Sequence, residues 1–508
     1  MILSPETRPG MAARQGDGPT LDALFRRAAA ARPTAIALAD PPNRFAIDGR
    51  SPQRLTYREA DAAIDGIAAA LTDLHLQADD IVAIALPNVT DSVIAILAVL
   101  RAGLIAAPVP LLFGRSAAAE ALSRVGAKAL ISCARVGDAD QGMEALALAG
   151  QVFTIRHVCA IRRDGPALPD GMVPLDAAIL AGPFPERDGA AAHVAIITWE
   201  TGKHGIVPVA RNHAELIAGG LAVMLECPVQ PAATHLTTLP ATSFGGLATG
   251  LMPWLLGGGT LVLHHGFAPD AFEEQCDTER PFLLTLPGPA AHLLAGAPFL
   301  ASESGIRAAI AAWQAPERLP REGALAGFSG ALVDVQIFGE IGLVAGRRGP
   351  DGLPPGIPFG LVTAPRQRKS EATPVIELMP SINRTLTLRG PMVPVASFRP
   401  GGLPGLKSAL DIRPNGFVDT GYPCGRDGSG AMILTGPPAG LATIGGHRCR
   451  VADAAQRVAA TAPGTALLAL PDGLLGHRLA LETADRPAAL RALADAGEDP
   501  LILAALAD

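Results

Sequence analysis

The chain has 508 residues, of which 49% are hydrophobic and 18% charged, and a formal net charge of −7. A chain of this length is too long to form a single small hydrophobic core, and the usual size of a domain predicts about three domains. The negative net charge gives no sign of a basic surface for nucleic acid, which argues against a nucleic-acid-binding protein.

The first predicted elements alternate between helix and strand. Residues 1–20 are polar and lack the basic-then-apolar order of a signal peptide, so we expect a cytoplasmic protein. Residues 21–31 are predicted to form an amphipathic helix with Thr20 as its N-cap, and residues 35–39 a buried strand. Residues 56–74 predict a further helix, because Thr56 and Glu59 have the spacing of a capping box.

The same alternation continues further along the chain. Residues 82–86 predict a strand, residues 91–101 a helix that ends at Gly103, and residues 106–110 another strand. The apolar run 93–113 is interrupted by Arg101, Gly103 and two prolines, so no membrane span is predicted. Repeated strand–helix–strand units indicate an α/β fold with a parallel sheet covered on both faces.

Cysteine and histidine positions predict no metal site. The six cysteines are widely spread without a C-x-x-C pair, so we expect buried free thiols rather than a zinc site or a disulfide scaffold. His264 and His265 follow a predicted strand and lack a partner at ligand spacing. We therefore expect both histidines to be exposed to solvent.

Several short segments in a fixed order carry a family resemblance. Residues 55–60 read L-T-Y-R-E-A, residues 82–88 V-A-I-A-L-P-N, residues 98–103 A-V-L-R-A-G and residues 255–262 L-L-G-G-G-T-L-V. Together they resemble the adenylate-forming superfamily, which holds acyl-CoA and aryl-CoA synthetases, firefly luciferase and peptide-synthetase adenylation domains. The resemblance extends over about residues 20 to 480.

This resemblance implies an α/β architecture with two domains. A large adenylate-forming N-terminal domain would contain parallel and mixed sheets sandwiched by helices, plus a small β subdomain, and a shortened α+β cap domain would follow. The expected boundaries are a flexible N-terminus at 1–19, the AMP-binding domain at 20–435 and a truncated C-terminal cap at 436–508.

The nucleotide-binding motifs of that family match this chain only in part. Residues 197–206 read I-T-W-E-T-G-K-H-G-I where the family's glycine-rich phosphate loop reads T-S-G-T-T-G-x-P-K-G, so Glu200 places a negative charge beside the phosphates. Residues 416–422 end in Tyr422, where the family has an Asp that accepts hydrogen bonds from the ribose hydroxyls. Phe338 stands where an aromatic ring stacks on adenine. The nucleotide-binding positions implied by the resemblance are Thr198, Thr201, Gly202, Lys203, Phe338, Gly339, Glu340 and Tyr422.

The acid-binding stretch P-x-F-H-x-x-G of the family corresponds to residues 240–246. The resemblance implies a substrate pocket formed by Ser243, Phe244, Gly245, Gly246 and Trp313. Trp313 stands where the family has no side chain, and we expect it to face Phe244. Two interpretations stay open: the indole fills the former pocket, or it recognises an aromatic ligand.

The C-terminal motifs depart most from the family. The hinge motif G-R-x-K-D reads G-P-P-A-G at residues 436–440, and the two prolines should stiffen the hinge. No lysine follows Lys407, so the family's catalytic lysine has no counterpart, and the catalytic residues are unknown.

Two functional hypotheses follow. In the first, the chain is a divergent acyl- or aryl-CoA synthetase-like protein with weak or lost adenylation activity, which binds an acyl or aryl acid, a thioester or a partner protein. In the alternative, it is an active ATP-dependent carboxylic acid–CoA ligase that forms an acyl-adenylate and then a thioester. ATP, Mg²⁺ and CoA would be cofactors only in the alternative. Both hypotheses are compatible with a homodimer.

Overall fold

The computed structural model describes residues 18–507 except 162–164, 176–183, 186–189, 203–204, 229, 295–304, 322–327, 329, 365–373, 396–397 and 399–409. The predicted helix at residues 21–31 is confirmed as α1 (Leu21–Ala31), and the Thr20 side chain accepts a hydrogen bond from the amide of Ala23. The capping box is also confirmed at the start of α3 (Tyr57–Asp73), where Thr56 and Glu59 bond reciprocally. The predicted N-terminal segment 1–19 lies almost entirely outside the described residues.

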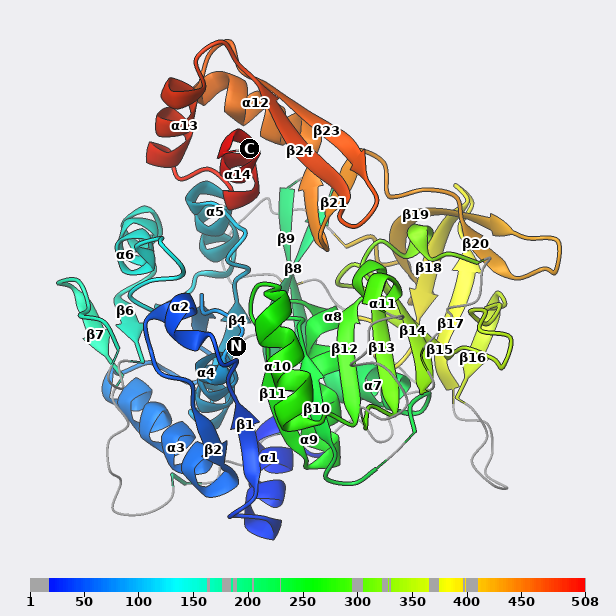
Figure 1. Ribbon diagram of the computed structural model, residues 1–508, viewed down its shortest axis with the longest axis horizontal. Helices are drawn as coiled ribbons and strands as arrows, with labels where there is room; N and C mark the ends of the chain where they lie inside the picture. The colour runs from blue at the N-terminus through cyan, green and yellow to red at the C-terminus, as the bar shows by residue number, and fades with distance from the viewer. Residues whose placement is uncertain are drawn as a thin grey trace.

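Two large sheets form the body of the protein (Figure 1). The seven-stranded sheet is parallel except for its last pair, and its order is β7 (Met172–Pro174), β6 (His157–Ala160), β5 (Ala129–Ser132), β3 (Ile81–Ile84), β4 (Ile105–Pro108), β8 (Val194–Gly202) and β9 (Gly205–Asn212). The eight-stranded sheet is parallel in its centre and antiparallel at both edges, and its order is β15 (Gly342–Arg347), β14 (Ala331–Phe338), β13 (Ala308–Trp313), β12 (Leu283–Pro287), β10 (Thr234–Thr237), β11 (Thr260–Leu263), β1 (Ile36–Ala39) and β2 (Arg54–Thr56).

Helices cover both faces of each sheet. The main core lies between the two sheets and includes α1, α3, α4 (Thr90–Arg101), α7 (His213–Met224) and α9 (Met252–Gly257). On the outer face of the seven-stranded sheet lie α5 (Arg115–Val125) and α6 (Gln141–Gln151), and on the outer face of the eight-stranded sheet lie α10 (Pro269–Glu279) and α11 (Gly288–Leu294). Short segments complete the body: α2 (Arg44–Asp48), α8 (Phe244–Gly246), the π-helical turn Leu247–Leu251 and the 3₁₀ turn Pro316–Arg318.

Two smaller antiparallel sheets follow along the chain. The five-stranded sheet consists of β16 (Gly360–Thr363), β17 (Pro374–Pro380), β18 (Thr385–Arg389), β19 (Val418–Arg426) and β20 (Met432–Leu434). The last sheet has the order β22 (His447–Arg450), β21 (Leu441–Ile444), β24 (Gly476–Glu482) and β23 (Ala466–Asp472), and it packs with α12 (Val451–Thr461), α13 (Arg486–Asp495) and α14 (Pro500–Ala507).

We call the unit from β21 to α14 the cap and the rest of the described chain the large domain. The cap has its own hydrophobic core and lies beside α5, at the end of the β8–β9 hairpin (Figure 1). The predicted α/β class with a small C-terminal α+β unit is confirmed, whereas the exact boundary at residue 436 stays a prediction. Within the described ranges, no helix is both long enough and apolar enough to cross a membrane.

The prediction of buried free thiols is confirmed for five of the six cysteines, but the histidine prediction is wrong. All six cysteines are free thiols, and five of them are buried. His264 is only 1% exposed, because its Nδ1 pairs with Gln275 of α10 at 2.7 Å and its ring packs against Phe272. His265 is half-buried, and its Nδ1 accepts a hydrogen bond from the amide of Asn88 at 3.1 Å.

Candidate functional site

The positions of the predicted phosphate loop lie in a regular β-hairpin. Thr198, Thr201 and Gly202 belong to β8, whose residues pair with β9 up to Gly202 opposite Gly205. Two residues connect the strands, and they include Lys203, which lies outside the described residues. Among the described residues of the motif, Thr198, Thr201 and Gly202 therefore lie in a paired strand and not in an open glycine-rich turn.

Alternation along β8 sends Trp199 and Glu200 to opposite faces of the sheet. The Trp199 indole is buried, and its Nε1 donates to the carbonyl oxygen of Pro108 at 2.7 Å. Glu200 is also buried, on the face that points toward the cap. Because its carboxylate is shielded from water, Glu200 requires a cationic or hydrogen-bonding partner.

Arg448 of the cap is that partner. Its Nη1 lies 2.5 Å from Glu200 Oε1, and its Nη2 donates to the Tyr422 hydroxyl at 2.6 Å. The side chains of Arg448 and Glu200 are 10% and 9% exposed. Burial alone would lower the pKa of Arg448, but Glu200 and Tyr422 outweigh it and raise this pKa above its ordinary value. Burial raises the pKa of Tyr422 to about 12, so its hydroxyl stays neutral at pH 7.

The predicted adenine-stacking segment contacts the same cluster. The ring of Phe338 is fully buried and meets the ring of Tyr422 edge-on, with their centroids 5.9 Å apart. Gly339 has a φ of 59°, and a Cβ at this position would collide with the Glu200 carboxylate and the Arg448 guanidinium. Glycine is required here both by the left-handed backbone and by the close approach of these two side chains.

Glu340 connects this cluster to the predicted acid-binding segment. Its amide donates to Glu200 Oε2 at 2.6 Å, and its own Oε2 accepts from the amide of Phe244 at 2.7 Å. Burial, followed by the neighbouring charge of Glu200, raises the pKa of Glu340 to about 7. The guanidinium of Arg211 donates to the backbone carbonyls of Glu340 and Met392 and lies 3.6 Å from the centroid of the Phe244 ring.

The glycines of the acid-binding segment serve close packing. Ser243 caps α8 by accepting a hydrogen bond from the amide of Gly246 at 3.1 Å. A Cβ on Gly245 would lie 2.7 Å from the side chain of Ile337, and a Cβ on Gly246 would collide with the carbonyl of Pro240. These glycines therefore bring the helix against β14 and the preceding chain.

Trp313 does not face Phe244, so that expectation is wrong. Along β13, Ile310 and Ala312 point into the core that contains Phe244, whereas Trp313 belongs to the core on the opposite face of the sheet. There its Nε1 donates to Asp334 at 2.8 Å, and its ring lies edge-on to His292. The other predicted substrate-pocket residues, 243–246, lie together at the N-cap and in the single turn of α8.

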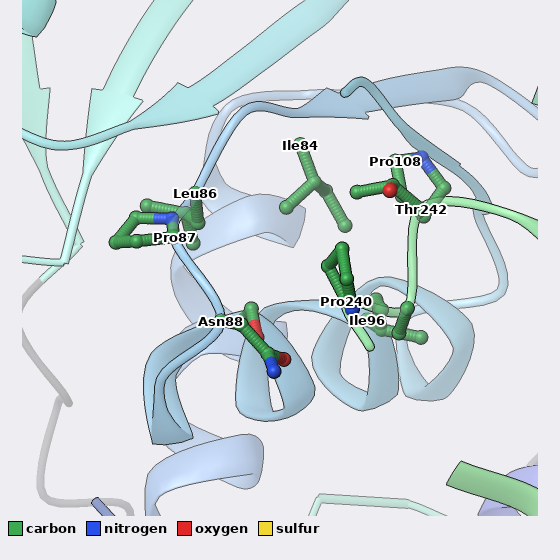
Figure 2. Close-up of a pocket in the computed structure, with 10 residues that line it drawn as sticks. Ile84, Leu86, Pro87, Asn88, Ile96, Pro108, Pro240 and Thr242 are labelled. Atoms are coloured by element: carbon green, nitrogen blue, oxygen red, sulfur yellow. The ribbon is translucent and has the colours of Figure 1, made fainter. Parts of the chain in front are cut away.

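Three cavities lie near the predicted motifs. A cavity of about 10 Å³ adjoins residues 240–242 and is lined mainly by apolar groups such as Ile84, Ile96 and Pro108 (Figure 2). A second cavity, of about 30 Å³, lies between Trp313 and the cap residues Gly446 and Leu475. The third cavity, of about 110 Å³, lies between α5, the β8–β9 hairpin and the cap. None of the three is lined by Phe338, Gly339, Glu340 or Tyr422.

Sequence reasoning missed Arg448 and Arg211, the two cations of the site. Arg448 lies 248 residues from Glu200 along the chain, so no local pattern joins the two. A signal for Arg211 would have been its place at the end of a buried strand, where a charged residue needs partners. No group of three or more potential metal ligands is found among the residues that the structure describes.

The buried carboxyl group of Glu340 predicts a pH-dependent stability. With a pKa of about 7 in the folded protein and 4.5 as its ordinary value, Glu340 is protonated in the folded state but ionised in the unfolded state between these pH values. The folded state then binds more protons, so this group's contribution to stability falls as the pH rises through this window and stays low above it. Relative to the wild type, Glu340→Gln should therefore gain about 1 to 3 kcal/mol in free energy of unfolding between pH 5 and pH 8.

Urea denaturation at several pH values measures this difference. The glutamine keeps an acceptor for the amide of Phe244, and the buried Glu215 titrates in both proteins, so its contribution cancels. Glu120→Gln on the exposed face of α5 is the control, and it should show no such trend. A stability difference for Glu340→Gln that does not change with pH would contradict the assignment.

Comparison with known proteins gives consistent results. A family described as "AMP-binding enzyme" matches residues 25–331. The chain is 30% identical over 270 residues to a salicyl-AMP ligase / salicyl-S-ArCP synthetase of Mycobacterium tuberculosis, covering 52% of this chain and 45% of that protein. It is 29% identical over 282 residues to a 2-hydroxy-7-methoxy-5-methyl-1-naphthoate–CoA ligase of Streptomyces carzinostaticus, covering 53% and 48%. The matched part of the chain thus spans about half the length of these curated relatives.

Solved structures of the same fold cover nearly the whole chain. Apo MbtA of Mycobacterium smegmatis superposes with a TM-score of 0.65 at 22% identity, covering 96% of this chain and 91% of that one. The amide bond synthetase McbA of Marinactinospora thermotolerans gives a TM-score of 0.69 at 18% identity, covering 94% of each chain. At sequence identities of 22% and 18%, this similarity shows a common fold and nothing further. Since the family match covers more than half of its residues, the chain belongs to the AMP-binding enzyme family of adenylate-forming proteins.

Proposed function

We propose that this protein is a member of the AMP-binding family that does not form adenylates and that instead binds an aryl or acyl acid or its thioester. The observation that carries the proposal is the buried cluster of Glu200, Tyr422 and Arg448, which lies at the positions where the family resemblance implies the phosphates and ribose. On this proposal, the chain's own side chains occupy the space that a nucleotide would need there.

The residues of this cluster do not fit ATP. Glu200 is a carboxylate within the predicted phosphate loop, and like charges a few ångström apart repel by about 1 to 4 kcal/mol. Arg448 could neutralise phosphate, but both of its outer nitrogens already bond to Glu200 and Tyr422. Tyr422 offers one hydroxyl in place of two carboxylate oxygens, and that hydroxyl accepts from Arg448.

A catalytic cation is also missing from the sequence. No lysine follows Lys407, and residues 436–440 hold neither the arginine nor the acid of the hinge motif. Removing one group that stabilises a charged transition state commonly costs about 10² to 10³ in rate. Several such groups are replaced at once, which favours a protein without adenylation activity over an active carboxylic acid–CoA ligase.

The ligand class is inferred from the relatives, and its place from the cavities. The cavity between α5, the β8–β9 hairpin and the cap measures about 110 Å³, whereas the cavity beside residues 240–242 measures about 10 Å³. The larger cavity is lined by arginines and carboxylates, which include Arg457, Asp453 and Asp499, as well as by Thr201 and Phe113. Because the matched relatives are named for aryl acids, we assign an aryl acid or its thioester as the preferred ligand.

Pyrophosphate exchange tests the absence of adenylation. With ATP, Mg²⁺ and a panel of carboxylic acids that includes salicylate and hydroxynaphthoates, the purified chain should exchange labelled pyrophosphate at the background rate, because the cations that assemble the reaction are replaced. An active aryl-acid ligase assayed in parallel verifies the panel. Acid-dependent exchange that disappears in Lys203→Ala would overturn the proposal and identify an active ligase.

Ligand binding is tested at the cavity between α5, the β8–β9 hairpin and the cap. Salicylate, naphthoate or their CoA thioesters should raise the melting temperature of the wild type, because a ligand that binds the folded state stabilises it. Ala117→Trp on α5 would fill the cavity and should abolish the shift. Ser123→Trp on the exposed side of the same helix is the matched control and should retain it. If the whole panel leaves the melting temperature unchanged, the binding proposal fails.

A further inference from the structure

The cluster at the predicted nucleotide position joins three separate parts of the chain. Glu200 comes from β8 in the large domain, Tyr422 from β19 in the five-stranded sheet, and Arg448 from β22 in the cap. The three side chains bond to one another: the Arg448 guanidinium pairs with the Glu200 carboxylate through one nitrogen and donates a hydrogen bond to the Tyr422 hydroxyl through the other. Unrelated losses of binding residues would not be expected to leave side chains that complement one another in this way.

We propose that Arg448 is a latch, whose ion pair with Glu200 and hydrogen bond to Tyr422 hold the cap closed on the large domain without any ligand. The backbone of Arg448 is held as well, because its carbonyl accepts from the Thr201 hydroxyl at 3.3 Å. The latch goes beyond the proposed function, since it concerns the position of the cap and not the ligand.

Three further contacts fix the cap at its rim. The amide of Gly114 at the start of α5 donates to Asp499 Oδ1 at 2.7 Å, and the amide of Arg115 donates to the carbonyl of Gly497 at 2.7 Å. On another side, Arg318 donates to the carbonyls of Asp472 and Gly473 at 2.9 and 2.8 Å. These contacts orient the cap, but each is a single hydrogen bond with a backbone group, whose net contribution to stability is modest because folding exchanges it for hydrogen bonds to water.

Charge separates the latch from these rim contacts. Arg448 and Glu200 are both charged and are only 10% and 9% exposed, whereas each rim hydrogen bond has at most one charged partner. Removing one partner of a buried ion pair leaves an uncompensated charge, which is strongly destabilising. An opened cap would return that charge to water. Loss of the latch should therefore populate an open cap, which uncovers the loop 111–115, where Gly114 packs against residues 497–499 of the cap.

Limited proteolysis of the full chain measures this opening. Subtilisin cleavage within residues 111–115, followed by mass spectrometry, should be at least about tenfold faster in Arg448→Ala than in the wild type, because the cap covers this loop and cleavage tracks the population of the open form. Small-angle scattering should show a larger radius of gyration for the same variant. Arg478→Ala removes an exposed arginine of the same cap and should be cleaved at the wild-type rate.

A second variant keeps the test decisive if Arg448→Ala fails to fold. Glu200→Gln preserves the shape of the side chain but removes its charge, so it should also speed cleavage. In the double variant Glu200→Ala with Arg448→Ala, neither charge is left unpaired, and the loss of stability should be smaller than the sum of the single losses. Cleavage of Arg448→Ala or Glu200→Gln at the rate of Arg478→Ala would overturn the latch. This outcome is independent of pyrophosphate exchange, which tests the proposed function.

Discussion

The ion pair between Glu200 and Arg448 is the interaction on which the arrangement of this protein depends. These two opposite charges are almost completely buried. The folded state tolerates them only as a pair, because burying either charge alone is costly. Their pairing requires the β8–β9 ladder to extend to the end of the predicted phosphate loop and Gly339 to have no side chain. It also requires the cap to be closed, because Arg448 belongs to the cap.

This constraint gives a physical account of the proposed loss of nucleotide binding in a family member whose fold is kept. The family match and the superposition on adenylate-forming structures establish the scaffold. Phe338 packs against Tyr422, and the Glu340 carboxylate accepts from the start of α8, so that two predicted nucleotide contacts are used within the protein. The proposed ligand site therefore moves to the cavity between α5, the hairpin and the cap.

Local sequence patterns predicted the elements well but not the partners within the site. The bounds of α1 and the capping box of α3 follow from spacing over a few residues, which is why they could be predicted. The pairing of Glu200 with Arg448 joins residues 248 positions apart, and His264 is buried by α10, so neither follows from local pattern. The face of Trp313, by contrast, could have been found from the alternation of Ile310 and Ala312 in a buried strand.

Calorimetric titration with Mg²⁺–ATP tests most directly whether the chain's own side chains fill the nucleotide position. The account predicts no measurable heat of binding for the wild type. It also predicts that the triple variant Glu200→Thr, Tyr422→Asp and Arg448→Ala, which removes the cluster and supplies a carboxylate for the ribose, gains affinity relative to the wild type. A wild-type dissociation constant in the micromolar range, about −8 kcal/mol of binding free energy, would contradict the central claim.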